Sequence, residues 1–544
     1  MKENQLPWYM NAVFYEVHVR AYCDSNKDGK GDLPGLISKL DYIKDLGVDC
    51  IWILPIYPSP LKDDGYDIAD YYEVMSDYGT IDDFKTLVKE AHDRGLRVIA
   101  DLVLNHTSDQ HHWFQKSRSD PDSKYRDYYV WSADDKKYAD ARIIFLDTEK
   151  SNWSFDEKAG LYFWHRFYST QPDLNYDNPE VVSEMMKVMD FWLGMGIDGF
   201  RADAVPYLIE REGTNCENLP ETHRILKQFR KHIDTNYQDK VLLAEANQWP
   251  MDVREYFGDG DEFHMGFHFP VMPRIFMALR RRDASPIHWI MSQTPDIPEN
   301  TQWCTFLRNH DELTLEMVTE EERQWMWEVY APEPRMRLNL GIRRRLAPLL
   351  DNDTRKIVLA NAILYSLPGA PIVYYGDEIG MGDNIWLFDR NGVRTPMQWN
   401  DGLNAGFSEA NPENLYAPVI DSGEYSFTKV NVAAQENDPD SLLNRMRRLI
   451  AVRKSHSIFA LGKIRFLAQE HTECLAILRT LRSEAVLCLI NLTEAEQVLS
   501  LDLSEFTGRK ITDLISNNNQ RLISEESETF TVQPYAFQWL KLVE

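Results

Sequence analysis

The sequence predicts an α/β fold, a (β/α)8 barrel with a subdomain inserted after its third strand and a C-terminal antiparallel β-sandwich. Eight apolar, strand-length runs alternate with helical segments up to Gly380. Three acidic residues, Asp203, Glu245 and Asp311, stand at the C-terminal ends of such runs, where barrel enzymes place their chemistry. After about Lys463 the pattern changes to short β-type runs separated by turn residues. A doubly wound open sheet is the alternative.

Most of the eight strand-length runs lack period-two alternation, which is typical of parallel strands buried on both faces. They are Val13–Val19, Cys50–Ile56, Leu96–Leu104, Ile197–Val205, Lys240–Asn247, Phe263–Phe269, Trp303–His310 and Ala370–Gly380. Start signals mark two of the helices, since Thr80 precedes Ile81–Arg94 and Asn178-Pro179 precedes Val181–Leu193. The other helical segments are Leu33–Leu46, Glu221–Ile233, Arg274–Arg282 and Leu442–Lys454.

Two connections are too long for ordinary loops. Residues 107–172, rich in Trp, Tyr, Asp and Ser, are expected to form a subdomain inserted into a barrel that comprises 1–106 and 173–463. The second connection, about 313–353, carries two arginine clusters and is interpreted either as a lid or as a helical excursion with a solvated basic face. Residues 464–544 are expected to form the β-sandwich.

Composition restricts the class of ligand. The 544 residues are 43% hydrophobic and carry a net charge of −27, which argues against nucleic acid and anionic membranes as partners. Six cysteines without CxxC spacing indicate free thiols in a reducing cytoplasm and argue against a structural zinc. Met1–Met10 does not resemble a signal peptide, and no apolar stretch is long enough to span a membrane. The sequence does not decide whether the protein forms a homo-oligomer.

Paired carboxyl groups that flank a labile bond are the requirement for glycoside cleavage, with one acid and one nucleophile or base. A third carboxylate nearby can raise the pKa of the acid by like-charge repulsion. Arg201 lies two residues before Asp203, on the same face of a strand, and could hold Asp203 ionised. His106 and His310 end strands and could donate to sugar hydroxyls. Metal-dependent hydrolysis is the competing interpretation, but no HExxH motif supports it.

Four sequence motifs indicate which protein family this pattern of residues resembles. The chain resembles the α-amylase superfamily (glycoside hydrolase family 13) over essentially its whole length, because the signature regions of that family occur here in the same order and spacing. They are Asp101-Leu-Val-Leu-Asn105-His106, Gly199-Phe-Arg201-Ala-Asp203, Glu245 in its apolar frame, and Asn309-His310-Asp311. Gln171-Pro-Asp173-Leu-Asn175 resembles a fifth region.

This resemblance implies a retaining mechanism. Asp203 would be the nucleophile, Glu245 the general acid/base, and Asp311 a transition-state-stabilising carboxylate that binds sugar hydroxyls. The implied glucosyl subsite is lined by Tyr66, His106, Arg201 and His310.

The resemblance also implies how that subsite is closed. Asp67, in Gly65-Tyr66-Asp67, matches a hydroxyl-binding aspartate of the family, and Arg394 matches an arginine that pairs with it. An Asp67–Arg394 pair would close the far end of the glucose site. That arrangement favours a pocket for one terminal glucose over an open cleft for starch.

Two structural metal sites are further expectations. The first is a calcium-type loop with oxygen ligands at alternating positions, and an Asx-rich turn is its alternative. Its residues are Asp24, Asn26, Asp28, Lys30 through its main chain, and Asp32. The second, for Ca²⁺ or Mg²⁺, would join the inserted subdomain to the barrel, unless its side chains serve as caps or turns. Its residues are Asn105, Asp173, Glu210 and the main-chain oxygens of Tyr207 and Leu208.

Several stretches, such as Asp311-Glu-Leu-Thr-Leu-Glu316, resemble one subgroup, the trehalose synthases. That likeness implies intramolecular isomerisation of the disaccharide maltose to trehalose, with minor hydrolysis and no organic cofactor. An α-glucosidase or a sucrose isomerase is the alternative of the same chemistry. A catalytically inactive binding subunit is the alternative of another class, and it predicts the loss of at least one acid. Trp386-Leu-Phe388 departs from the subgroup pattern and is expected on the acceptor side.

Overall fold

Eight parallel strands close into a barrel in the computed structural model, which describes residues 6–516, 519–524 and 527–543. Strand β1 is hydrogen-bonded to both β2 and β14, so the sheet has no edge. The predicted barrel is therefore confirmed, and the open-sheet alternative is excluded. In spatial order the strands are β1 (Phe14–Val17), β14 (Ala370–Tyr374), β10 (Gln302–Phe306), β9 (Met265–Phe267), β8 (Val241–Ala244), β7 (Gly199–Asp203), β3 (Arg97–Val103) and β2 (Cys50–Ile53).

The outer helices begin where the sequence places their caps. The Thr80 hydroxyl accepts from the Asp83 amide at the start of α4 (Ile81–Asp93), and Asn178 caps α6 (Pro179–Leu193) through the Glu180 amide. The segment predicted as one helix over Leu33–Leu46 is divided at Lys39. The other principal helices around the barrel are α2 (Leu33–Ser38), α3 (Leu40–Leu46), α7 (Pro220–Asn236), α9 (Val271–Arg281), α10 (Ser285–Ser292), α13 (Thr354–Ser366) and α15 (Leu442–Ser455).

Two excursions from the barrel frame its C-terminal mouth. The segment after β3 forms helix α5 (His112–Ser119) and a three-stranded antiparallel sheet of β4 (Trp131–Ser132), β6 (Leu161–Trp164) and β5 (Trp153–Asp156). The segment after β10 combines a helix with a small sheet, so it is neither purely helical nor a bare loop. Its elements are β11 (Leu313–Thr314), α11 (Glu320–Tyr330), β12 (Arg337–Leu338), β13 (Gly341–Ile342) and α12 (Leu346–Leu349).

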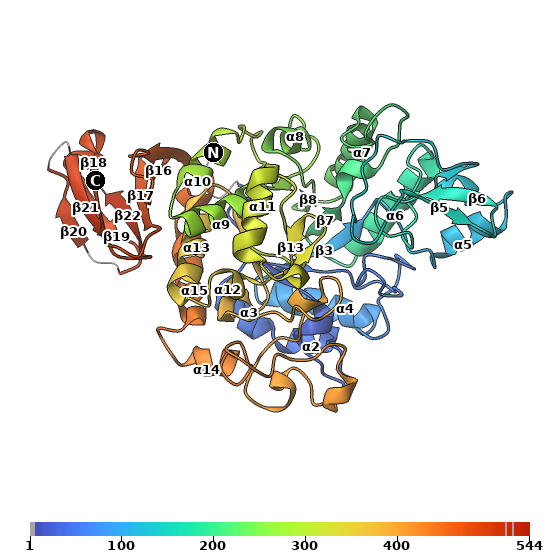
Figure 1. Ribbon diagram of the computed structural model, residues 1–544, viewed down its shortest axis with the longest axis horizontal. Helices are drawn as coiled ribbons and strands as arrows, with labels where there is room; N and C mark the ends of the chain where they lie inside the picture. Colours follow the sequence, from blue (N-terminus) through green and yellow to red (C-terminus); the bar gives the residue numbers. More distant parts are fainter. Residues whose placement is uncertain (1–5, 517–518, 525–526, 544) are drawn as a thin grey trace.

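The C-terminal residues form the predicted antiparallel sandwich, which Figure 1 shows at one end of the long axis, opposite the inserted subdomain. Leucines from both sheets, including Leu487 and Leu499, share one apolar core. The strands of the larger sheet are β15 (Lys463–Leu467), β16 (Cys474–Leu481), β17 (Glu484–Asn491), β22 (Phe537–Val543), β19 (Lys510–Asp513) and β20 (Asn519–Leu522). The smaller sheet pairs β18 (Gln497–Asp502) with β21 (Ser527–Val532).

Candidate active site

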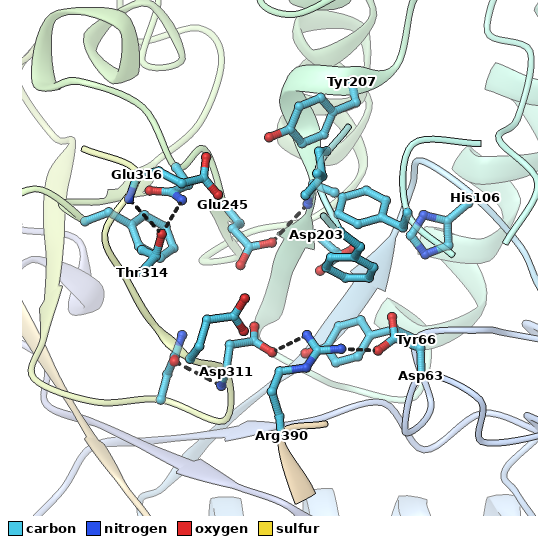
Figure 2. Close-up of a pocket in the computed structure, with 18 residues that line it drawn as sticks. Asp63, Tyr66, His106, Asp203, Tyr207, Glu245, Asp311, Thr314, Glu316 and Arg390 are labelled. Carbon is cyan, nitrogen blue, oxygen red and sulfur yellow. Dashed lines mark hydrogen bonds and ion pairs between the residues drawn. The ribbon is translucent and has the colours of Figure 1, made fainter. Parts of the chain in front are cut away.

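Three carboxylates from separate strands meet at one cavity in the barrel mouth. Asp203 ends β7, Glu245 follows β8 directly, and Asp311 lies beyond the end of β10. The cavity measures about 800 Å³ counted to its open mouth, a size typical of small-molecule sites. Figure 2 shows that the three side chains face this common space from different sides. The sequence therefore placed the three acids at one end of the barrel correctly.

Arg201 bridges three acids, of which Asp101 and Asp203 are buried and Glu245 is partly exposed. Its Nη1 atom lies 2.6 Å from Asp203 Oδ1 and 2.6 Å from Asp101 Oδ1, and its Nη2 atom lies 2.5 Å from Glu245 Oε1. The guanidinium is fully buried and packs over the ring of Trp52 at 5.2 Å. The expected contact between Arg201 and Asp203 is thus formed, and the same cation also orients the second acid. Asp101 was not identified as a site residue from the sequence.

The environment gives the three acids different proton affinities. Burial, reinforced by Asp203 and Asp311 against the opposing charge of Arg201, raises the pKa of Glu245 to about 8. Burial also raises the pKa of Asp203, but only to about 6, because Arg201 and a hydrogen bond from Glu245 stabilise its charged form. Burial by itself would raise the pKa of Asp311, but His310, Arg390 and Arg394 outweigh this effect and hold the pKa well below its ordinary value. At neutral pH the site therefore combines a protonated Glu245 with ionised Asp203 and Asp311.

Aromatic and imidazole side chains form one wall of the cavity. The ring of Tyr66 stacks on that of His310 with centroids 5.3 Å apart. Tyr66 and His106 line the cavity directly. Burial lowers the pKa of His106 to about 3, so its imidazole is neutral, and its Nε2 atom lies 3.2 Å from Gln171 Nε2.

An ion pair that the sequence interpretation missed closes one end of the cavity. Arg390 Nη2 lies 2.5 Å from Asp63 Oδ1, and Arg390 Nη1 lies 2.7 Å from Asp311 Oδ1. Figure 2 shows both contacts at the cavity wall. Asp63 stands three residues before Tyr66 in the same motif, so its neighbourhood was recognised but the wrong acid was chosen.

The predicted Asp67–Arg394 pair is wrong. Asp67 accepts instead from the Ser59 hydroxyl at 2.8 Å and from two backbone amides of its own loop. Arg394 contacts Asp64 at 3.1 Å and Asp311 at 3.0 Å, and it donates to the His310 carbonyl. The reason is the turn at Asp64 and Gly65, both with positive φ, which directs successive acids to different sides.

A bridge from the inserted subdomain, which we call the roof, contacts two residues that line the cavity, Glu316 and Tyr207. Arg142 of that subdomain contacts Glu316, beyond Asp311, at 2.6 Å and Glu217 at 2.8 Å, and it donates to the Tyr207 hydroxyl. Aromatic rings add to the lining of the cavity, among them Phe145, Phe167 and Tyr207. The two long connections therefore meet above the acids.

Trp386 and Phe388 do not line the cavity, contrary to the expectation that they reach the acceptor side. Their side chains are 68% and 75% exposed. Arg343 donates to the carbonyls of Leu387 and Asp389 and so fixes this loop with both rings outward. Arg390, two residues beyond Phe388, is the part of the loop that reaches the cavity.

The second predicted metal site has the arrangement of a cation cradle. Asn105 Oδ1, Asp173 Oδ2 and Glu210 Oε1 are buried, and none has a hydrogen-bond donor within the described ranges. Asp173 and Glu210 are close enough for the charge of Asp173 to raise the pKa of Glu210 beyond the effect of burial. Burying three oxygens without hydrogen-bond donors costs folding free energy unless these oxygens coordinate a cation. These side chains therefore fit a hard, oxygen-coordinated ion.

The first predicted metal loop lacks such a signature. Asp24 accepts from the amides of Asn26, Lys27 and Gly29, and Asp32 accepts from Gly35. Asx-type turns therefore account for its acceptors without an ion. Across the described part of the chain, no group of three or more His, Cys, Asp or Glu side chains is arranged to hold a metal.

The cysteines and the helices bear on two further predictions, free thiols and the lack of a membrane span. All six cysteines are unpaired. Among the residues that the structure describes, no helix combines the length and apolar character that crossing a bilayer requires.

Named relatives extend over nearly the whole chain. The trehalose synthase/amylase of Mycobacterium tuberculosis is 57% identical over 542 residues, which cover 98% of this chain and 90% of that protein. The trehalose synthase of Pimelobacter sp. is 54% identical over 550 residues, 99% of this chain and 96% of the relative. The crystal structure of the trehalulose synthase of Pseudomonas mesoacidophila MX-45 superposes with a TM-score of 0.79 at 27% identity, covering 99% of this chain and all of that one.

Family models divide the chain as the fold does. The alpha amylase catalytic domain matches residues 16–331 and 342–462, and the maltogenic amylase C-terminal domain matches residues 464–539. The first match contains the barrel, the inserted subdomain and all three acids. The chain belongs to the α-amylase family, glycoside hydrolase family 13.

Proposed function

We propose that this chain converts maltose into trehalose by intramolecular transfer of a glucosyl group. The observation that carries the proposal is a cavity at the barrel mouth in which Arg201 holds an ionised Asp203 beside a protonated Glu245. The names of the relatives, trehalose synthases at 54–57% identity, support trehalose as the product. The small cavity, closed by Asp63 and Arg390, supports a disaccharide rather than a polymer.

The first half of the reaction follows from these proton affinities. Glu245 donates its proton to the glycosidic oxygen of maltose while an Asp203 oxygen attacks the anomeric carbon. The bond to the leaving glucose breaks, and a β-glucosyl ester of Asp203 forms. Arg201 contacts both Asp203 and Glu245 through its two terminal nitrogens, so the two carboxyl groups lie on one guanidinium, which supports the retaining mechanism with its closely spaced pair.

The second half reuses the same two carboxyl groups. The released glucose turns within the cavity until its anomeric hydroxyl faces the ester carbon. Glu245, now a carboxylate, takes the proton of that hydroxyl, and the oxygen displaces Asp203 with a second inversion. The result is an α,α-linked disaccharide. Asp311 and its arginines would hold the glucosyl hydroxyls throughout.

Incubating the purified protein with maltose and an excess of isotopically labelled glucose tests this proposal. We expect trehalose as the main product, with almost no label, because the released glucose never leaves the cavity. The Asp203→Ala variant should remain folded but form neither trehalose nor glucose. Glucose as the sole product would make the protein an α-glucosidase, and a strong preference for sucrose would make it a sucrose isomerase.

The pH dependence of kcat/KM for maltose should be bell-shaped, with a maximum between about pH 6 and about pH 8. The Asp203 pKa of about 6 sets the acidic limb, because activity is lost as this nucleophile is protonated. The Glu245 pKa of about 8 sets the basic limb, because the acid is lost as pH rises. A rate profile from about pH 4 to about pH 10 measures both. A plateau that extends to about pH 10 would contradict the role of Glu245.

The roof over the cavity would keep water from the Asp203 ester. Arg142 links the inserted subdomain to Glu316 and Glu217, so that both long connections close over the acids. Exclusion of water is what separates transfer to the trapped glucose from hydrolysis. The roof thus supports isomerisation over glucosidase activity.

Substituting Arg142 by Ala should therefore raise the ratio of glucose to trehalose, by about tenfold if the competing barriers shift by about 1.4 kcal/mol. Product analysis from maltose measures this ratio. Arg118→Ala is the matched control, because Arg118 lies in the same subdomain and pairs with Asp156 rather than with the roof. An unchanged ratio in Arg142→Ala would show that the bridge does not control access of water.

A structural cation is part of the proposal. Asn105, Asp173 and Glu210, with main-chain oxygens of Tyr207 and Leu208, would hold Ca²⁺ or Mg²⁺ at the junction of subdomain and barrel. When bound, the ion would neutralise two buried carboxylates. The loop at Asp24–Asp32 is retained as a second, weaker candidate for Ca²⁺. The six unpaired cysteines support a reducing, cytoplasmic location.

Chelation should lower the melting temperature of the protein by about 5 °C, and added Ca²⁺ should restore it. Differential scanning calorimetry with and without chelator measures the shift. The Asp173→Asn variant should lose this response, because it removes one charge of the cradle. Asp28→Asn, in the first loop, is the control. A full response in Asp173→Asn would place the stabilising ion elsewhere.

A further inference from the structure

Glu16 is a fully buried carboxyl group for which the mechanism above has no role. It lies on β1, in register with Trp52 on one neighbouring strand and with Tyr374 on the other. The preceding side chain, Tyr15, points to the opposite face and donates to Glu378. Glu16 therefore points into the barrel, beneath the acids of the active site.

One oxygen of Glu16 contacts two nitrogens of a single residue. Oε1 lies 2.5 Å from Nδ1 of His310 and 3.2 Å from its backbone nitrogen. The other oxygen, Oε2, is buried and meets no donor in the part of the chain that the structure describes. The carboxyl group thus faces only His310, which precedes the active-site residue Asp311.

The far side of the same imidazole faces the side chain of Asp311. Nε2 of His310 lies 3.2 Å from Asp311 Oδ2 and is not used in a hydrogen bond by any described residue. Arg390 and Arg394 keep Asp311 ionised. A bare nitrogen lone pair held at this distance from a carboxylate would be repelled, so Nε2 must carry a proton.

We propose that Glu16 is a positioning residue that shares one proton with His310 Nδ1 and thereby keeps the Nε2 proton directed at Asp311. The pair holds two protons in all, one on Nε2 and one between Oε1 and Nδ1. Nε2 then presents a fixed proton to Asp311 Oδ2 and positions this carboxylate, which lines the cavity. This inference rests on the proposed role of Asp311 in sugar binding.

Burial favours one distribution of the shared proton. It raises the pKa of Glu16 well above its ordinary value and lowers that of His310. A neutral carboxylic acid that donates to a neutral imidazole is therefore the resting form. It also leaves Oε2 as an uncharged oxygen, which costs less without a donor than a buried charge does.

The contact geometry predicts that an amide cannot replace this acid. The oxygen at the Oε1 position must donate to Nδ1 and also accept from the His310 amide, which a protonated carboxyl oxygen can do. A glutamine nitrogen there can donate but not accept, and a glutamine oxygen can accept but not donate. With oxygen in that place, the proton moves to Nδ1 and Nε2 loses its own.

The test is a double-mutant cycle on hydrolysis of p-nitrophenyl α-glucoside, an activity that does not depend on the acceptor. Glu16→Gln should lower kcat/KM by about tenfold or more, as loss of an orienting partner does elsewhere. In a His310→Ala background the same change should have an effect within about twofold. Glu378→Gln is the matched control, because this buried acid only accepts, from Tyr15 and Tyr42, and an amide oxygen can replace it.

Each outcome of this cycle either supports or overturns the proposed role of Glu16. Wild-type kcat/KM in Glu16→Gln would overturn the proposal, and so would an equal loss in the His310→Ala background, which would indicate a general structural effect. Should the wild type hydrolyse the α-glucoside too slowly to measure, as exclusion of water from the cavity would predict, the proposed function stands, and a second readout tests the inference alone. In ¹⁵N-histidine-labelled protein, the signal that His310→Ala removes should report a protonated Nε2 in the wild type and a bare one in Glu16→Gln.

Discussion

The active site depends on one buried cation. Asp101, Asp203 and Glu245 all contact the buried Arg201 at the barrel mouth. Three carboxyl groups this close would otherwise suppress one another's ionisation and leave no nucleophile. Because Arg201 and Asp203 lie two residues apart on β7, the cation and its principal partner are fixed by one strand. The positions of the acids are therefore set by the barrel rather than by mobile loops.

A second group of cations separates Asp311 from the other acids. Arg390 and Arg394 come from the segment after the last barrel strand and bind its carboxylate directly. The arginine on β7 is shared by three acids, whereas Asp311 contacts two guanidinium groups, one shared with Asp63 and the other with Asp64. This unequal division of positive charge explains why one carboxyl group retains a proton that its neighbour releases. The pKa of each carboxyl group in this site thus depends on which arginines it contacts, the one on β7 or the two that follow β14.

The sequence predicted what depends on local patterns and missed what depends on turns. Strand runs, helix caps and the order of motifs identified the barrel, its family and the acids Asp203, Glu245 and Asp311. The acid that pairs across the glucose end could not be chosen, because Asp63, Asp64 and Asp67 are adjacent and a reversal of the backbone assigns each to a different partner. Glu16 gave no signal either, since a lone acid in a strand resembles any other until the opposite strand is in place.

The ion pairs at one end of the proposed glucose site have a consequence for how successive substrates would be handled. Asp63, Arg390 and Asp311 are joined by two ion pairs and all line the cavity. A sugar bound at that end would meet these charged side chains, and a glucan chain would not slide forward past them after a cleavage. In the proposed reaction, catalysis would then be distributive rather than processive, with dissociation of the product before the next substrate enters.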